Sequence, residues 1–195
     1  MADRIFLSLW FPTQLENEML PRLESALLQF PISKRRSGVL SVTVQPLEWS
    51  EAALLSEVFE PGIPSPAAVA ALREFAHDDY AFEAVACWDV WTFSRTGWKL
   101  DPLPVRFVAI GEQFGDAAAR EMGHLMLDLG MDTPFLAEGA VWNPQTETRI
   151  AANIAQLLKL SHDLEATLHP TGRLLWSESD RDLAHQLTAR LQRVH

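Results

Sequence analysis

The segment that most constrains the fold is residues 80–91, YAFEAVACWDVW, an apolar stretch that contains two carboxylates. Because side chains of a β-strand alternate between two faces, each face can be listed separately. One face is aromatic and aliphatic, with Tyr80, Phe82, Ala84, Ala86, Trp88 and Val90. The other is mixed, with Glu83, Val85, Cys87, Asp89 and Trp91. The pattern predicts a central strand with one face in the core and a second face that either lines a cleft or contacts solvent.

Length and composition favour one soluble domain. The chain has 195 residues and is 48% hydrophobic, which is ample for a core. Cys87 is its only cysteine, so no intramolecular disulfide can form, and its place in an apolar strand predicts a buried filler. The early apolar run is too short for a signal peptide, and no run reaches the roughly 18–20 residues that cross a bilayer. We therefore expect a cytoplasmic protein.

The charge balance restricts the class of partner. The formal net charge is −10, from 26 acidic and 16 basic residues, and the only basic run is residues 34–36. Proteins that bind nucleic acids or anionic membranes need clustered cations. The sequence therefore predicts neither, and favours a basic protein or a small molecule as partner. The alternative is that the charge serves only solubility.

Periodicity and turn residues predict the order of elements. Strands are expected over residues 4–10, 40–46, 80–91, 105–111, 124–129 and 173–176, and helices over 13–30, 67–76, 146–168 and from about 180 onward. Residues 49–59 fit a short helix or a strand, and we favour a strand that pairs with 40–46. Pro61, Gly62 and Pro64 predict a turn, with Ser65 as the cap of the next helix. Residues 94–104 are expected to form a turn-rich link, and 132–145 an exposed loop containing Phe135 and Trp142.

The first six elements follow the order strand, helix, strand, strand, helix, strand, which is that of a ferredoxin-like sandwich. We therefore expect a single α+β domain over residues 1–195 with a mostly antiparallel sheet. Its N-terminal half would be ferredoxin-like, with additional strands and C-terminal helices packed on the sheet. A division into sub-lobes 1–93 and 104–195 is the alternative.

A group of histidines and acids suggests one kind of chemistry. His77, Asp78 and Asp79 lie at a predicted helix-to-strand corner, and His124 and Asp128 lie on a later strand. Together they supply the ligand types of a divalent metal, which His77, Asp78 and His124 could bind in a metal-dependent hydrolase. However, His124 and Asp128 would lie about 13 Å apart on a straight strand. The alternative is that His77 and Asp78 only terminate a helix.

The seven tryptophans favour recognition of a ligand or a partner. Trp88 and Trp91 should point to opposite faces of one strand, so at most one of them fills a given core. In the absence of an assembled catalytic motif, the sequence favours a binding or protein-interaction domain without a cofactor. The candidate ligand or partner residues are Asp78, Asp79, Asp89, Trp91, His124, Asp128 and Trp142. A small-molecule site between the sheet and residues 132–145 is a further alternative.

Overall fold

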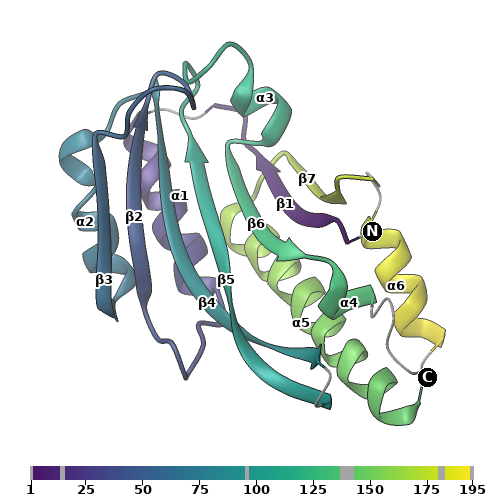
Figure 1. Cartoon of the computed structure of the whole chain (residues 1–195). Helices are drawn as coiled ribbons and strands as arrows, with labels where there is room; N and C mark the ends of the chain where they lie inside the picture. The colour runs from purple at the N-terminus through teal and green to yellow at the C-terminus, as the bar shows by residue number, and fades with distance from the viewer. Residues whose placement is uncertain (1, 14–15, 95–96, 137–142, 180–182, 194–195) are drawn as a thin grey trace.

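The computed structural model describes residues 2–13, 16–94, 97–136, 143–179 and 183–193. Within them, one seven-stranded antiparallel sheet has the order β3-β2-β4-β5-β6-β1-β7 (Figure 1). The strands are β1 (Arg4–Trp10), β2 (Val39–Pro46), β3 (Leu55–Ile63), β4 (Tyr80–Ser94), β5 (Gly97–Ile110), β6 (Leu125–Met131) and β7 (Gly172–Ser177). The helices are α1 (Glu16–Gln29), α2 (Ser65–Ala70), α3 (Ala118–Met122), α4 (Thr133–Leu136), α5 (Pro144–Leu168) and α6 (Leu183–Arg193). A 3-10 turn, Arg73–Phe75, follows α2.

The expected α+β class and antiparallel sheet are confirmed. Helices α1 and α5 lie behind the sheet in Figure 1, and the main core fills the layer between them and the strands. Alternation along β1 explains this layer, because Ile5, Leu7 and Leu9 all point to the helices and are fully buried. None of the described helices is long and apolar enough to cross a membrane.

The ferredoxin-like arrangement of the first half is not confirmed. Strand β1 pairs with β6 and β7, at the far side of the sheet from β2 and β3. The order of elements along the chain is therefore as expected, but the first half does not close on itself. The β4–β5 hairpin connects its strands to those of the second half in one continuous sheet.

Strand β4 has the two faces that its alternation predicts. On the helix side, Phe82 and Trp88 are fully buried. The Trp88 ring lies 5.7 Å from the ring of Phe30 and 6.0 Å from that of Phe135. The expectation of an exposed loop over 132–145 is therefore wrong at Phe135, which lies in α4 and is 1% exposed. Trp142 lies outside the described residues.

Three local predictions are wrong, over residues 94–104, 61–64 and 65–76. The expected link 94–104 is mostly strand, because β5 begins at Gly97. Its prolines, Pro102 and Pro104, precede the first residue that pairs with β6, so they interrupt no bond on that side. Strand β3 likewise continues through its own proline and glycine at the sheet edge. Helix α2 ends at Ala70, and its N-cap is Pro64 rather than Ser65.

The face of the sheet away from α1 and α5 is covered at one end by residues 111–122, which include α3 (Figure 1). A second, smaller core lies there. It comprises Ala81, Val108, Ile110, Phe114, Ala119 and Met126. We call the remainder of this side the open face; the side chains described next lie on it or at its margins.

Candidate functional site: an aromatic groove on the open face

The predicted corner residues His77, Asp78 and Asp79 do lie together, with one ligand atom of each within 4.8 Å of the others. The His77 Nδ1 atom contacts a carboxylate oxygen of Asp79 and lies 3.4 Å from one of Asp78. The Gln113 side chain donates to Asp78 Oδ2 at 2.6 Å, and its backbone N–H donates to the Asp78 carbonyl at 2.9 Å. These bonds attach the start of β4 to the segment after β5.

His124 is separate from this corner. It is 6% exposed and lies just before β6. The Phe11 backbone N–H donates to His124 Nδ1 at 2.9 Å, so Nδ1 is the acceptor nitrogen. The other nitrogen, Nε2, then carries the proton and donates to Glu112 Oε2 at 3.0 Å. Because both ring nitrogens are engaged, His124 does not offer one to a metal in this arrangement.

Asp128 is the centre of an ion network on the open face. It is 3% exposed. Arg4 Nη2 lies 2.5 Å and Arg106 Nη2 3.6 Å from Asp128 Oδ2, and the Gly130 N–H donates to Oδ1 at 3.1 Å. Arg106 also pairs with Glu83 at 3.2 Å. The pKa of Glu83 is raised, because the effect of burial exceeds the opposing effect of Arg106. The network connects four neighbouring strands, and its buried carboxylate is fully paired.

Asp89 and Trp91 support neighbouring segments. Asp89 accepts hydrogen bonds from Ser33 Oγ at 2.6 Å and from the Lys34 N–H at 3.2 Å. The Arg149 guanidinium lies 4.3 Å from the centre of the Trp91 ring. These contacts hold the loop before β2 and the first turns of α5 against β4. On the second face of β4, which was expected to line a cleft or to contact solvent, Asp89 and Trp91 thus contact other elements of the chain.

The five residues of the predicted metal site are not brought together. In the described part of the chain, the one group of three metal-ligating residues this close is the His77 corner, and neither His124 nor Asp128 belongs to it. The larger hydrolase site therefore has no common centre.

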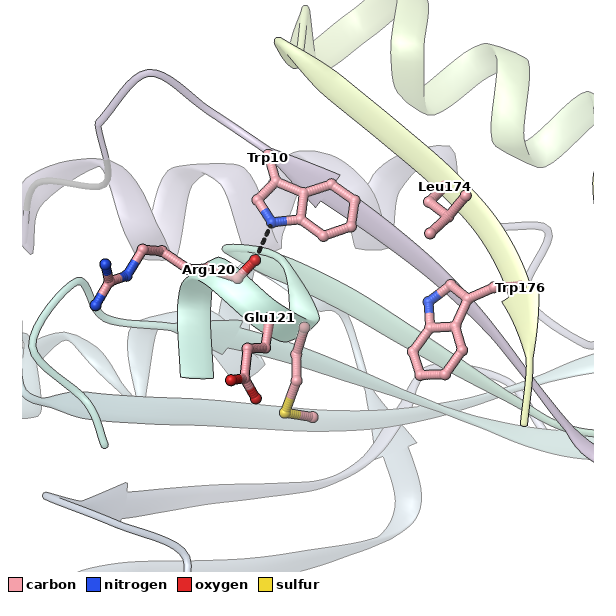
Figure 2. Close-up of a pocket in the computed structure, with 6 residues that line it drawn as sticks. Trp10, Arg120, Glu121, Leu174 and Trp176 are labelled. Atoms are coloured by element: carbon pink, nitrogen blue, oxygen red, sulfur yellow. Dashed lines mark hydrogen bonds between the residues drawn. The ribbon is translucent and has the colours of Figure 1, made fainter. Parts of the chain in front are cut away.

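A pocket of about 690 Å³ lies on the open face, between α3 and the edge strand β7 (Figure 2). We call it the aromatic groove. It is lined by Trp10, Arg120, Glu121, Met122, Leu174 and Trp176. Register explains its shape, because Trp10 is opposite Gly172 and Phe6 is opposite Trp176. Trp10 and Trp176 therefore lie about 13 Å apart along the strands, and Leu174 lies between them.

Hydrogen bonds fix both indole rings. Trp10 Nε1 donates to the Arg120 carbonyl at 3.0 Å, and Trp176 Nε1 donates to Ser8 Oγ at 3.0 Å. The Trp176 ring also stacks on Phe6 with a centroid distance of 4.5 Å and an angle of 27°. Both tryptophans are only partly buried. The groove thus presents ordered aromatic surface whose N–H groups are already satisfied.

The sequence analysis did not select Trp10 or Trp176. The signal that could have found them is alternation within the first strand, where Phe6 and Trp10 occupy the face opposite the core residues. Leu174 and Trp176 form the same pattern in β7. The pairing of these two strands, from opposite ends of the sequence, could not be inferred from spacing.

Comparisons of the chain with family models, with curated proteins and with solved structures find no match.

Proposed function

We propose that the chain is a non-enzymatic binding protein of the cytoplasm, and that its aromatic groove receives an apolar side chain of a partner protein. The observation that carries the proposal is the pair of partly exposed tryptophans, Trp10 and Trp176, on either side of a pocket of about 690 Å³. Tryptophan is enriched among the residues that dominate interface energies. The cytoplasmic setting is supported by the single, buried cysteine, Cys87.

Pre-ordering of the two rings favours binding. Each ring is held by its own indole N–H, so the approach of a ligand does not have to immobilise it. Ordering a side chain at an interface costs roughly 0.5–1.5 kcal/mol, and this cost is met during folding of the groove. A partner that contacts Trp10, Leu174 and Trp176 would bury apolar surface without leaving an indole donor unpaired.

The charged residues of the groove favour a cationic partner. The Arg120 guanidinium extends away from both tryptophans in Figure 2, and it donates to the Asp116 carbonyl at 3.3 Å. Glu121 is exposed, and no ion pair joins it to another described residue. We therefore expect the bound side chain to be flanked by Lys or Arg, consistent with the net charge of −10.

Fluorine NMR of protein labelled with 5-fluorotryptophan tests this site directly. The probe is a library of peptides that combine aromatic and basic residues. Each resonance is assigned with a Trp→Phe variant. A peptide that binds the groove should shift the resonances of Trp10 and Trp176 and leave that of Trp88, which is fully buried, unchanged.

Variants supply the controls. Trp176→Ala should weaken binding about tenfold or more, as expected for a central interface tryptophan. Phe93→Ala is the control, because Phe93 is an aromatic residue of β4 that is 45% exposed but does not line the groove. Glu121→Lys covers the case in which Trp176→Ala unfolds, since it changes an exposed residue. Equal peptide affinity for wild type and both groove variants would contradict the proposal, and a response only to uncharged compounds would favour a small-molecule ligand.

A divalent-cation site at the His77 corner is the second candidate, supported by three ligand atoms within 4.8 Å. It would be the basis of the metal-dependent hydrolase alternative, without His124 and Asp128. Calorimetric titration with Zn²⁺ tests it. Binding that His77→Ala abolishes would support the site, whereas equal heats for both proteins would exclude it.

A further inference from the structure

The other edge of the sheet, formed by β3, exposes apolar side chains. Leu47, Trp49, Leu54 and Val58 are 54%, 43%, 49% and 72% exposed. Three of them precede the strand in the β2–β3 connection, and among the described strands β3 has a neighbour on one side only, β2. We call these four residues, with Glu48, Glu51, Glu57 and Glu60, the β3 edge surface. A sheet edge carries unpaired backbone donors and acceptors, so it is a template for an added strand.

The connection before β3 is held in one conformation. Gln45 is 9% exposed, and its side-chain nitrogen donates to the carbonyls of Glu48 and Glu51 at 3.0 and 2.5 Å. The Leu47 carbonyl accepts a bond from the Gly115 N–H at 2.7 Å. The Trp49 ring packs edge-on against Phe114 at 4.7 Å. The exposed apolar groups are therefore presented on an ordered support.

Charge on this surface has one sign. Residues 37–72 contain no Lys, Arg or His. Four glutamates in that segment, at positions 48, 51, 57 and 60, are exposed. No ion pair within the described chain neutralises them. A second copy of the chain placed edge to edge would set like charges against each other, which opposes self-association.

Alternation along β3 indicates what would cover it. Leu55 and Phe59 pack against the main core, so Glu57 lies on their side and Val58 on the open face. An added strand would place one set of its side chains beside Val58 and the alternate set beside Glu57. The first set should be apolar and the second cationic.

We propose that β3 binds an extended segment of a partner protein in which apolar and basic residues alternate, as an eighth strand of the sheet. The site is distinct from the aromatic groove, which lies at the opposite end of the strand order. Backbone hydrogen bonds would supply affinity. The glutamates would select the partner and make the association weaken with added salt.

A nine-residue peptide of alternating valine and lysine is a suitable probe. Titrated into ¹⁵N-labelled protein, it should perturb the amide signals of residues 54–60 more than those of β7. The same peptide with glutamate for lysine should not bind. Neither should a version whose alternate peptide nitrogens are methylated, because it cannot donate to the edge. Binding that survives methylation would overturn strand addition.

Substitutions in the protein also test whether the peptide binds at β3. Glu57→Lys should weaken binding of the valine–lysine peptide about tenfold. Glu165→Lys makes the same charge change at an exposed position of α5 and should leave affinity within about twofold. Equal effects of the two substitutions, perturbations confined to the aromatic groove, or dimerisation of the free protein through residues 54–60 would each overturn the proposal.

Discussion

The side chain of Asn153 pairs with both backbone polar groups of Trp91. The Trp91 N–H donates to Asn153 Oδ1 at 2.9 Å, and Asn153 Nδ2 donates to the Trp91 carbonyl at 2.8 Å. The same nitrogen donates to the Pro134 carbonyl at 2.8 Å. Pairing of β2 with β4 ends at Ala86, so none of the described strands pairs with this part of β4 on that side. A side chain of α5 thus takes the place of a neighbouring strand.

We predict that Asn153→Leu destabilises the protein by about 2–4 kcal/mol, because it removes the partners of the partly buried backbone groups of Trp91 and of the buried Pro134 carbonyl. Urea denaturation followed by circular dichroism measures the loss. Gln156→Leu is the control, since the Gln156 side chain makes one long bond of 3.4 Å to the Asp89 carbonyl. Equal stability of the Asn153 variant and wild type would mean that water or another group satisfies Trp91.

Asp89→Ala should release the loop that precedes β2. Asp89 accepts from Ser33 Oγ and the Lys34 N–H, and both bonds are lost in the variant. Local opening then becomes less costly, so trypsin should cleave after Lys34, Arg35 or Arg36 several-fold faster than in wild type. Mass spectrometry of timed digests identifies the sites. Asp163→Ala, on an exposed helical ion pair, should digest at the wild-type rate.

The carboxyl group of Asp101 should titrate below the usual range. Thr92 Oγ1 donates to it at 2.5 Å, and Lys99 lies 3.0 Å away; the Thr92 bond is the largest cause of the lowered pKa. Thr92→Val should therefore raise the pKa of Asp101, measured by ¹³C NMR of the carboxyl carbon. Thr148→Val, which removes a hydroxyl on α5, should not change it.

The lowered pKa of Asp101 also determines how its contribution to the free energy of unfolding changes with pH. Asp101 has a lower pKa folded than unfolded, so its contribution is present above the ordinary aspartate pKa and is lost as pH falls through the folded pKa. The difference in unfolding free energy between wild type and Thr92→Val should accordingly shrink on acidification over that window. A constant difference from pH 7 to pH 2 would contradict this assignment.

Cys87 should behave as an inert thiol in the folded protein. It is fully buried, and burial is the main cause of its raised pKa. Reaction with Ellman's reagent at pH 8 should therefore be slow, and it should accelerate sharply once urea unfolds the chain. Ser50→Cys in a Cys87→Ala background supplies an exposed thiol for comparison. Rapid labelling of wild type under native conditions would show that β4 opens locally.

Much of the fold was accessible from periodicity. The strand from Arg4, the buried face around Phe82 and Trp88, and the long helix that contains Ile154 all follow apolar spacing, and the structure confirms them. The start of β5 could not be predicted from periodicity. Pro102 is unfavourable inside a sheet unless one side of the strand is unpaired there, and that depends on where β6 stops pairing with β5, which is after Asp128.

The candidate site was harder to predict from the sequence than the fold. Proximity in sequence correctly joined His77 to its two aspartates, but His124 and Asp128 engage other groups. The partners that occupy them, such as Phe11 and Arg4, come from the beginning of the chain. Such pairings depend on the strand order, which a single sequence with alternating apolar residues does not specify.

The register of β1 and β7 has a consequence for the order of assembly. The hydrogen bond from Trp176 to Ser8 joins residues 168 positions apart, whereas the β3 edge depends on hairpin contacts within residues 39–63. Contacts of large sequence separation carry a greater loop-closure entropy and tend to form late. We therefore expect a folding chain to present the β3 edge before the aromatic groove exists. During that interval the chain could bind a partner at the β3 edge but not in the aromatic groove.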